Sequence, residues 1–144
     1  MGKFFIFIRL PWKRPFGGEG TTALDTQDLL RDLMRVDGVR GCAIICKDGF
    51  VVEKDLLPKN LQADSDELAV LVTTFHGMAR KIVSKMGMPE IDLLNLECPD
   101  GSHILIQDLG GTLLVVLADK DATIGKIRFE VKRRKGRIAE SLEM

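Results

Sequence analysis

Two short apolar runs place the strongest constraint on what this chain can fold into. Apart from Arg40, residues 39–46 (VRGCAIIC) and 113–117 (LLVVL) carry no charge, and both alternating faces of each predicted strand are apolar. Strands of this kind lie in the middle of a sheet that is covered on each side. The sequence therefore predicts a sheet between layers of helix, with these two strands at its centre.

The spacing of apolar residues predicts three helices for those layers. They are expected at about 26–36, 64–86 and 121–142. The second is the longest, with Asp64 or Ser65 as its N-cap and Gly87 just after its end. This helix is long enough to cross a sheet.

Turn residues separate the predicted strands. Asp48-Gly49, Pro99-Asp100-Gly101 and Gly110-Gly111 each lie between apolar runs, as in hairpins. The strands are expected at 39–46, 50–56, 91–98, 102–108 and 112–118. The order along the chain is then helix, two strands, helix, three strands, helix.

The long helix has two faces without charge. At 100° per residue, one apolar face is expected to lie on the sheet, and it comprises Leu68, Leu71, Val72, Phe75, Ala79, Ile82 and Met86. The opposite face carries the small or uncharged residues Val70, Thr73, Gly77 and Ser84. Either these are a chance run on a solvated surface, or they let a second helix approach closely in a dimer, which is the interpretation we favour.

The N-terminal segment differs in composition from the rest. Five of the eight aromatic residues lie in the first sixteen positions: Phe4, Phe5, Phe7, Trp12 and Phe16. A glycine-rich stretch follows, so residues 1–20 are predicted to be an arm with a linker and residues 21–144 the domain. The arm is either packed on the domain's own surface or a segment that docks on a partner or a membrane surface.

Charge and hydropathy exclude several classes of protein. Lys and Arg total 21, as do Asp and Glu, so no overall field favours nucleic acid. No apolar run approaches the roughly 18–20 residues of a membrane span, and the N-terminal run is too short for a signal peptide. Three cysteines, Cys42, Cys46 and Cys98, are expected to stay reduced. A cytoplasmic location is expected.

Motifs for catalysis, cofactors and metals are missing from the sequence. It has neither a phosphate-binding loop of the G-x-x-x-x-G-K-[ST] type nor a G-x-G-x-x-G fingerprint. His76 and His103 have no nucleophile or carboxylate at a diagnostic spacing, and Cys42 and Cys46 lie roughly 13 Å apart on a strand. We therefore expect no enzymatic activity, no cofactor and no metal ion.

The last predicted helix is strongly basic. It carries Lys126, Arg128, Lys132, Arg133, Arg134, Lys135 and Arg137 against Glu130. This run is either a solvated helix face or a surface that docks on an acidic protein or an anionic lipid, and the balanced overall charge argues against nucleic acid.

Three segments, together with the order of elements, resemble one known family. Residues 36–41 (VDGVRG), 47–52 (KDGFVV) and 121–126 (DATIGK) resemble the Roadblock family of dynein light-chain-like proteins, including its MglB-like prokaryotic regulators of Ras-like GTPases. The resemblance covers about residues 24–142. Within it, Gly38 would end the first helix, Gly49 would form the first hairpin and Gly125 would bring the last helix close to the sheet.

The resemblance implies an α+β fold of the Roadblock/profilin-like type. Its five-stranded antiparallel sheet is sandwiched between helices, and two copies join by their third strands while their second helices pack together. In this chain the dimer or partner interface would comprise Val70, Thr73, Gly77, Arg80 and Ser84 of the helix and Ile91, Leu93 and Asn95 of the strand.

The resemblance also implies a function. Prokaryotic members of the family bind Ras-like GTPases on the surface of the paired helices. The chain is thus expected to be a non-catalytic dimeric regulator that binds a Ras-like small GTPase and modulates its nucleotide cycle. Two alternatives remain open: a dimeric scaffold subunit of a membrane or motor complex, and a ligand-sensing domain with an internal pocket.

Overall fold

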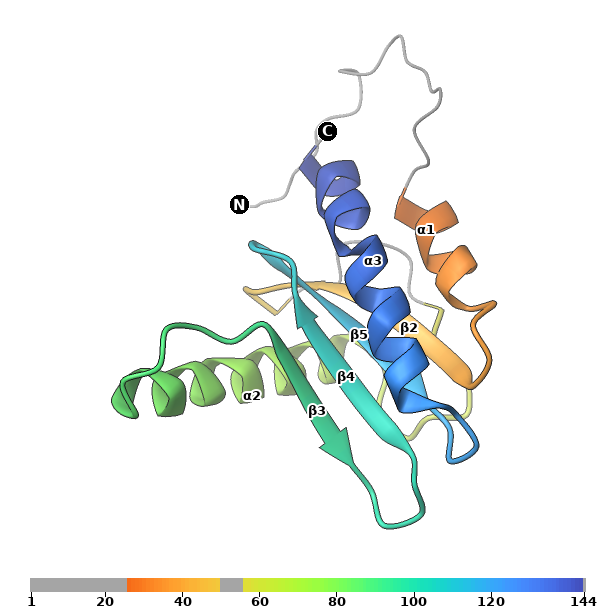
Figure 1. Cartoon of the computed structure of the whole chain (residues 1–144), viewed down its shortest axis with the longest axis horizontal. Coiled ribbons are helices and arrows are strands. Elements are labelled where there is room, and N and C mark those ends of the chain that lie inside the picture. The colour runs from red at the N-terminus through yellow and green to blue at the C-terminus, as the bar shows by residue number, and fades with distance from the viewer. Residues whose placement is uncertain (1–25, 50–55, 144) are drawn as a thin grey trace, which may run out of the picture.

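The computed structural model describes residues 26–49 and 56–143, which form a sheet with helices on both faces (Figure 1). The elements are α1 (Thr26–Leu33), β2 (Val39–Cys46), α2 (Ser65–Lys85), β3 (Leu93–Glu97), β4 (His103–Asp108), β5 (Thr112–Ala118) and α3 (Ile124–Glu143). Helices α1 and α3 lie on one face of the sheet and α2 lies on the other. The predicted α+β class and layered arrangement are confirmed.

The sheet is antiparallel, and its strands run in the order β2-β5-β4-β3. It has four strands in the described part of the chain, whereas five were expected. The second expected strand, 50–56, lies outside the described residues except for Leu56. Leu56 exchanges two backbone hydrogen bonds with Cys42, at 2.8 and 3.4 Å, on the side of β2 that faces away from β5.

The larger core lies between the sheet and the pair α1 and α3. Its fully buried side chains come from both helices and from three strands: Leu29, Leu30, Leu33, Cys42, Ile44, Leu105, Leu114, Val116, Ile127, Val131 and Ile138. At the far ends of the two helices the hydroxyls of Thr26 and Ser141 lie 2.6 Å apart. Removing these side chains from water is the main source of stability on this face.

A buried arginine also links α1 to α3. Arg134 is 6% exposed, and its guanidinium donates to Asp32 at 2.8 Å and to Glu130. The hydrogen bond from Arg134 is the main reason that the pKa of Glu130 lies below its usual value. A charge this deeply buried is tolerated because it is paired on both sides.

The layer under α2 is thinner. Four strand residues, Ile45, Ile106, Leu113 and Val115, form a small core with Ala69 of the helix. The helix begins after Asp64, whose side chain accepts a hydrogen bond from the backbone N–H of Glu67 at 2.8 Å. This contact assigns the N-cap to Asp64, one of the two candidates, and fixes where α2 starts.

The three cysteines differ in how deeply they are buried. Cys42 is fully buried, and burial raises its pKa to about 12. Cys46 is half-buried and Cys98 is exposed, and no disulfide joins the three. Cys42 is therefore a core residue, whereas Cys46 is only partly enclosed.

Two of the three family glycines lie in turns, although α1 ends at Leu33, before Gly38. Gly38 and Gly49 have φ values of +93° and +102°, in the left-handed region that glycine tolerates best. The expectation for Gly125 is wrong, because a Cβ at Gly125 would meet no atom within 4 Å. It is Gly38 that makes the close approach, since a Cβ there would lie 2.3 Å from Cβ of Ala122.

We predict that Gly38→Ala lowers the free energy of unfolding by about 2 kcal/mol or more, because the new methyl group meets both a left-handed backbone and Ala122. Gly136→Ala is the matched control, since Gly136 is exposed within α3 and its Cβ would meet no atom within 4 Å. It should raise stability by up to about 1 kcal/mol. Urea unfolding measures both; equal effects would contradict the close packing of Gly38.

Candidate functional site

Helix α2 meets the sheet through small and polar side chains. Its buried residues are Ala69, His76 and Ala79, and Val72 packs against the same small core. These positions recur every three or four residues, so they form one stripe along the helix. The short alanine side chains let the helix axis approach the apolar side chains of the strands.

The prediction of which side of α2 faces the sheet is therefore partly wrong. Val72 and Ala79 do face the sheet, but Leu71, Phe75, Ile82 and Met86 are exposed, by 55%, 39%, 58% and 73%. Met78, 59% exposed, lies on the same side. We call these five residues, Leu71, Phe75, Met78, Ile82 and Met86, the apolar stripe of α2. The helix is rotated so that its largest apolar side chains point away from its own sheet.

Strand β3 forms one end of the described sheet. It pairs with β4, with Leu94 opposite Ile106 and Asn95 opposite Leu105. Within the described ranges no other strand lies along its second side. Its backbone groups on that side are therefore open to pairing with another chain.

The structure places the predicted interface residues at three different locations. Gly77, Arg80, Ser84 and Ile91 come together around one cleft. Val70 is exposed and Thr73 half-buried, and both lie beside the turn at Gly49. Leu93 and Asn95 are in β3, where Leu93 packs against the larger core and Asn95 Oδ1 lies 2.9 Å from His103 Nδ1.

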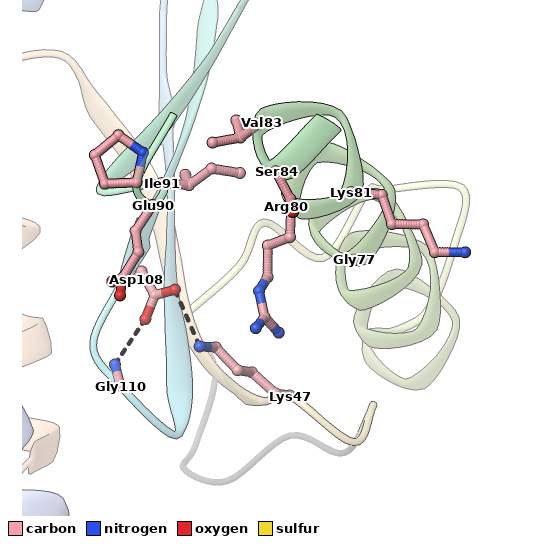
Figure 2. Close-up of a pocket in the computed structure, with 11 residues that line it drawn as sticks. Lys47, Gly77, Arg80, Lys81, Val83, Ser84, Glu90, Ile91, Asp108 and Gly110 are labelled. Carbon is pink, nitrogen blue, oxygen red and sulfur yellow. Dashed lines mark hydrogen bonds and ion pairs between the residues drawn. The ribbon is translucent and has the colours of Figure 1, made fainter. Parts of the chain in front are cut away.

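The cleft lies between the C-terminal half of α2 and the sheet end that carries the β4–β5 turn (Figure 2). Its volume is about 720 Å³, and it opens to solvent. It is lined by Lys47, Gly77, Arg80, Lys81, Val83, Ser84, Pro89, Glu90, Ile91, Asp108 and Gly110. We call it the Arg80 cleft, because the side chain of Arg80 extends into it toward Lys47.

Asp108 organises the floor of the Arg80 cleft. Its Oδ2 accepts a hydrogen bond from Lys47 Nζ at 3.0 Å, and its Oδ1 accepts one from the backbone N–H of Gly110 at 2.7 Å. His76 Nε2 lies 3.2 Å from Oδ2 but makes no hydrogen bond there. Asp108 therefore neutralises Lys47 and faces a buried imidazole.

The environment of His76 keeps its ring neutral near pH 7. The side chain is 2% exposed, and this burial is the main reason that its pKa is lowered. The carboxylate of Asp108 opposes the shift, while the cations Lys47 and Arg80 reinforce it. The sequence analysis did not place His76 in the core, although its spacing from Ala69, Val72 and Ala79 could have indicated a buried position.

A model of the Roadblock/LC7 domain matches residues 25–118, well over half of the chain. The chain belongs to the Roadblock/LC7 family. Among curated proteins, an uncharacterized protein of Methanocaldococcus jannaschii is 31% identical over 110 residues, which cover 76% of this chain and 90% of that protein. The match to the domain model confirms the family that the sequence motifs indicated.

Solved structures show the same Roadblock fold. The gliding protein MglB of Thermus thermophilus has a TM-score of 0.72 to this chain at 23% identity, covering 82% of this chain and 88% of MglB. A structure described as MglB with a tetrameric arrangement gives the same TM-score, identity and coverage. These structural similarities show that this chain shares the arrangement of its helices and strands with MglB.

The basic helix of this Roadblock domain is largely engaged in internal ion pairs. Lys132 and Lys135 both bind Asp92, which precedes β3, and the hydrogen bond from Lys132 is the main reason that the pKa of Asp92 lies well below its usual value. Arg133 and Arg134 bind Glu130. Lys126, Arg128 and Arg137 are exposed and form no ion pair within the described residues, so a smaller basic surface remains for a partner than the sequence indicated.

Two expectations from the sequence concern ions and membranes. Across residues 26–49 and 56–143, no three His, Cys, Asp or Glu side chains are placed to hold a metal ion. No helix in those ranges is long and apolar enough to cross a membrane. The aromatic arm, residues 1–20, and the expected boundary after it lie outside the described residues.

We predict that His76 makes the unfolding free energy depend on pH as the pH falls below about 7. Because the pKa of His76 is lowered below 6.5 in the folded chain, the unfolded chain takes up the proton first, and stability falls as the pH falls. The slope contributed by one such group is at most about 1.4 kcal/mol per pH unit.

His76→Gln should flatten this slope. His103→Gln should keep it, because His103 lies in β4 and does not contact Asp108. Urea unfolding at a series of pH values measures the slope directly. Identical slopes for the wild type and His76→Gln would show that His76 does not resist protonation in the folded chain.

Proposed function

We propose that this Roadblock/LC7 domain forms a homodimer that binds a Ras-like small GTPase and modulates its nucleotide cycle. The observation that carries the proposal is the apolar stripe of α2, which lies exposed on the same helix that borders the Arg80 cleft. In this proposal the dimer acts in the cytoplasm and supplies a binding surface, and any hydrolysis of nucleotide takes place on the partner.

The apolar stripe supports dimerisation on energetic grounds. Fully burying one Leu, Ile, Met or Phe side chain contributes about 1.5–3 kcal/mol. The five residues of the stripe are between 39% and 73% exposed, so covering them makes several kcal/mol available. A contiguous apolar face of this kind marks an interaction surface on most proteins.

A second copy of the chain fits this surface because β3 is the end strand of the same sheet. Two β3 strands placed antiparallel would extend the sheet across a two-fold axis. Helix α2 lies across one face of that sheet, so the same rotation would bring two α2 helices side by side. One symmetric contact would thus cover both the open strand edge and the apolar stripe.

The predicted interface residues then take two roles. We assign dimer contact to the apolar stripe and to the strand residues Leu93 and Asn95. Gly77, Arg80, Ser84 and Ile91, which line the Arg80 cleft, and Val70 and Thr73, on the same flank of α2, are assigned to the partner. The small side chains on that flank leave the helix backbone accessible to a second protein.

We predict that Ile82→Glu converts the dimer to a monomer, because the new carboxylate would be buried against the apolar stripe of the second copy. Thr74→Glu is the matched control, since Thr74 is exposed on α2 outside the stripe and the change adds the same charge. Sedimentation equilibrium at tens of micromolar should give a dimer for the wild type and Thr74→Glu. A monomeric wild type, or a dimeric Ile82→Glu variant, would contradict the assignment.

The resemblance to a family with prokaryotic regulators of Ras-like GTPases supports a GTPase as the partner of such a dimer. The switch loops of a Ras-like GTPase change order with the γ-phosphate, so a surface that contacts them binds the GTP and GDP forms differently. A single GTPase lying across a two-fold axis would exclude a second one. The proposed stoichiometry is therefore one GTPase to two copies of the chain.

We predict that calorimetric titration with the Ras-like GTPase encoded nearest to this gene gives different affinities for its GDP form and for its complex with a non-hydrolysable GTP analogue. The expected stoichiometry is one GTPase per dimer. Equal affinity for both forms would favour the scaffold function instead. Absence of binding to either form would contradict the regulator proposal for that GTPase.

A further inference from the structure

Arg80 carries a charge that the described part of the chain does not neutralise. Its side chain extends from α2 into the Arg80 cleft, toward Lys47 (Figure 2). No ion pair or hydrogen bond joins its guanidinium to any residue in 26–49 or 56–143. An arginine fork offers five N–H donors and favours a planar two-oxygen acceptor.

Neither carboxylate in the lining of the cleft forms an ion pair with Arg80 within the described residues. Asp108 already uses Oδ2 for Lys47 and Oδ1 for the N–H of Gly110. Glu90, the other acidic residue of the lining, forms no ion pair within the described residues. The lining has three cations, Lys47, Arg80 and Lys81, against these two carboxylates, so the cleft has a surplus of positive charge.

The other lining groups favour a carboxylate over a phosphate. Phosphate sites are commonly built from free backbone N–H groups at a helix N-terminus, but the cleft lies along the C-terminal half of α2, and the N–H of Gly110 is already donated to Asp108. Val83, Pro89 and Ile91 add apolar surface, and Gly77 and Ser84 leave room for a chain to approach. This mixture matches a peptide segment.

We propose that the Arg80 cleft binds an acidic segment of a partner protein, with the guanidinium of Arg80 holding a glutamate or aspartate side chain of that segment. The remaining segment lies against Ile91 and the small residues of α2. The assignment uses only the lining of the cleft, so it does not depend on dimer formation or on the partner being a GTPase.

The test uses the full-length chain labelled with ¹⁵N and a blocked peptide that contains two glutamates. The backbone amides of Gly77, Ser84 and Gly110 should shift saturably with this peptide and not with the same peptide carrying glutamines. Arg80→Gln should weaken the binding about tenfold, the equivalent of one charged hydrogen bond. Lys85→Gln should not, because Lys85 is exposed in the last turn of α2 and does not line the cleft.

The imidazole of His76 gives a second, independent readout. Asp108, Lys47 and Arg80 are the charged groups that act on it, and the two cations lower its pKa. A bound carboxylate beside Arg80 should therefore raise the pKa of His76, measured from the chemical shift of its ring proton. The same peptide should leave this pKa unchanged in Arg80→Gln.

Three results would overturn the proposal. Shifts confined to the basic surface of α3 would place the peptide elsewhere. Equal weakening by Arg80→Gln and Lys85→Gln would show that the peptide is attracted by the net charge of the protein alone. Saturable shifts in the cleft with inorganic phosphate at matched ionic strength, as strong as those with the peptide, would make the cleft a small-anion site.

Discussion

Strand β5 presents buried apolar side chains to both faces of the sheet, and the need to cover both determines how the helices are arranged. Leu114 and Val116 face α1 and α3, while Leu113 and Val115 face α2. Neither pair could remain in water without a cost of several kcal/mol. The neighbouring strand β2 repeats the pattern with Ile44 and Ile45, so both strands are covered on both faces in a three-layer domain.

The two layers are covered in different ways, and this difference is the basis of the proposed function. Helices α1 and α3 contribute large aliphatic side chains, and their contact is reinforced by buried Arg134. Helix α2 contributes alanines and a neutral histidine to the sheet, so its large apolar side chains are left exposed on one flank and Arg80 on the other. Because both flanks of α2 are exposed, one flank can pack against a second copy of the chain and the other can bind a partner protein.

Much of this architecture could be predicted from the sequence, because strands β2 and β5 combine apolar runs with turn residues and α2 has clear cap and stop signals. The rotation of α2 could not, since periodicity shows which residues share a face but not which face meets the sheet. The largest side chains, such as Phe75 and Ile82, were assigned to the core, whereas Ala69 and His76 occupy it. The Arg80 cleft could not be predicted from the sequence either, because Lys47, Arg80 and Asp108 are far apart along the chain. Turns could be predicted, by contrast, because a turn such as that at Gly38 depends on a few consecutive residues, which the family resemblance includes.

The central claim is that the open edge of β3 and the apolar stripe of α2 are covered together by a second copy. Amide hydrogen exchange at two protein concentrations tests it most directly, because dilution separates the copies without changing the chain. We predict that the amides of β3 that point away from β4, together with those of α2, exchange faster on dilution, while those of β5 do not change. Exchange in β3 and α2 that is independent of concentration, in a protein that sediments as a monomer throughout, would contradict the claim.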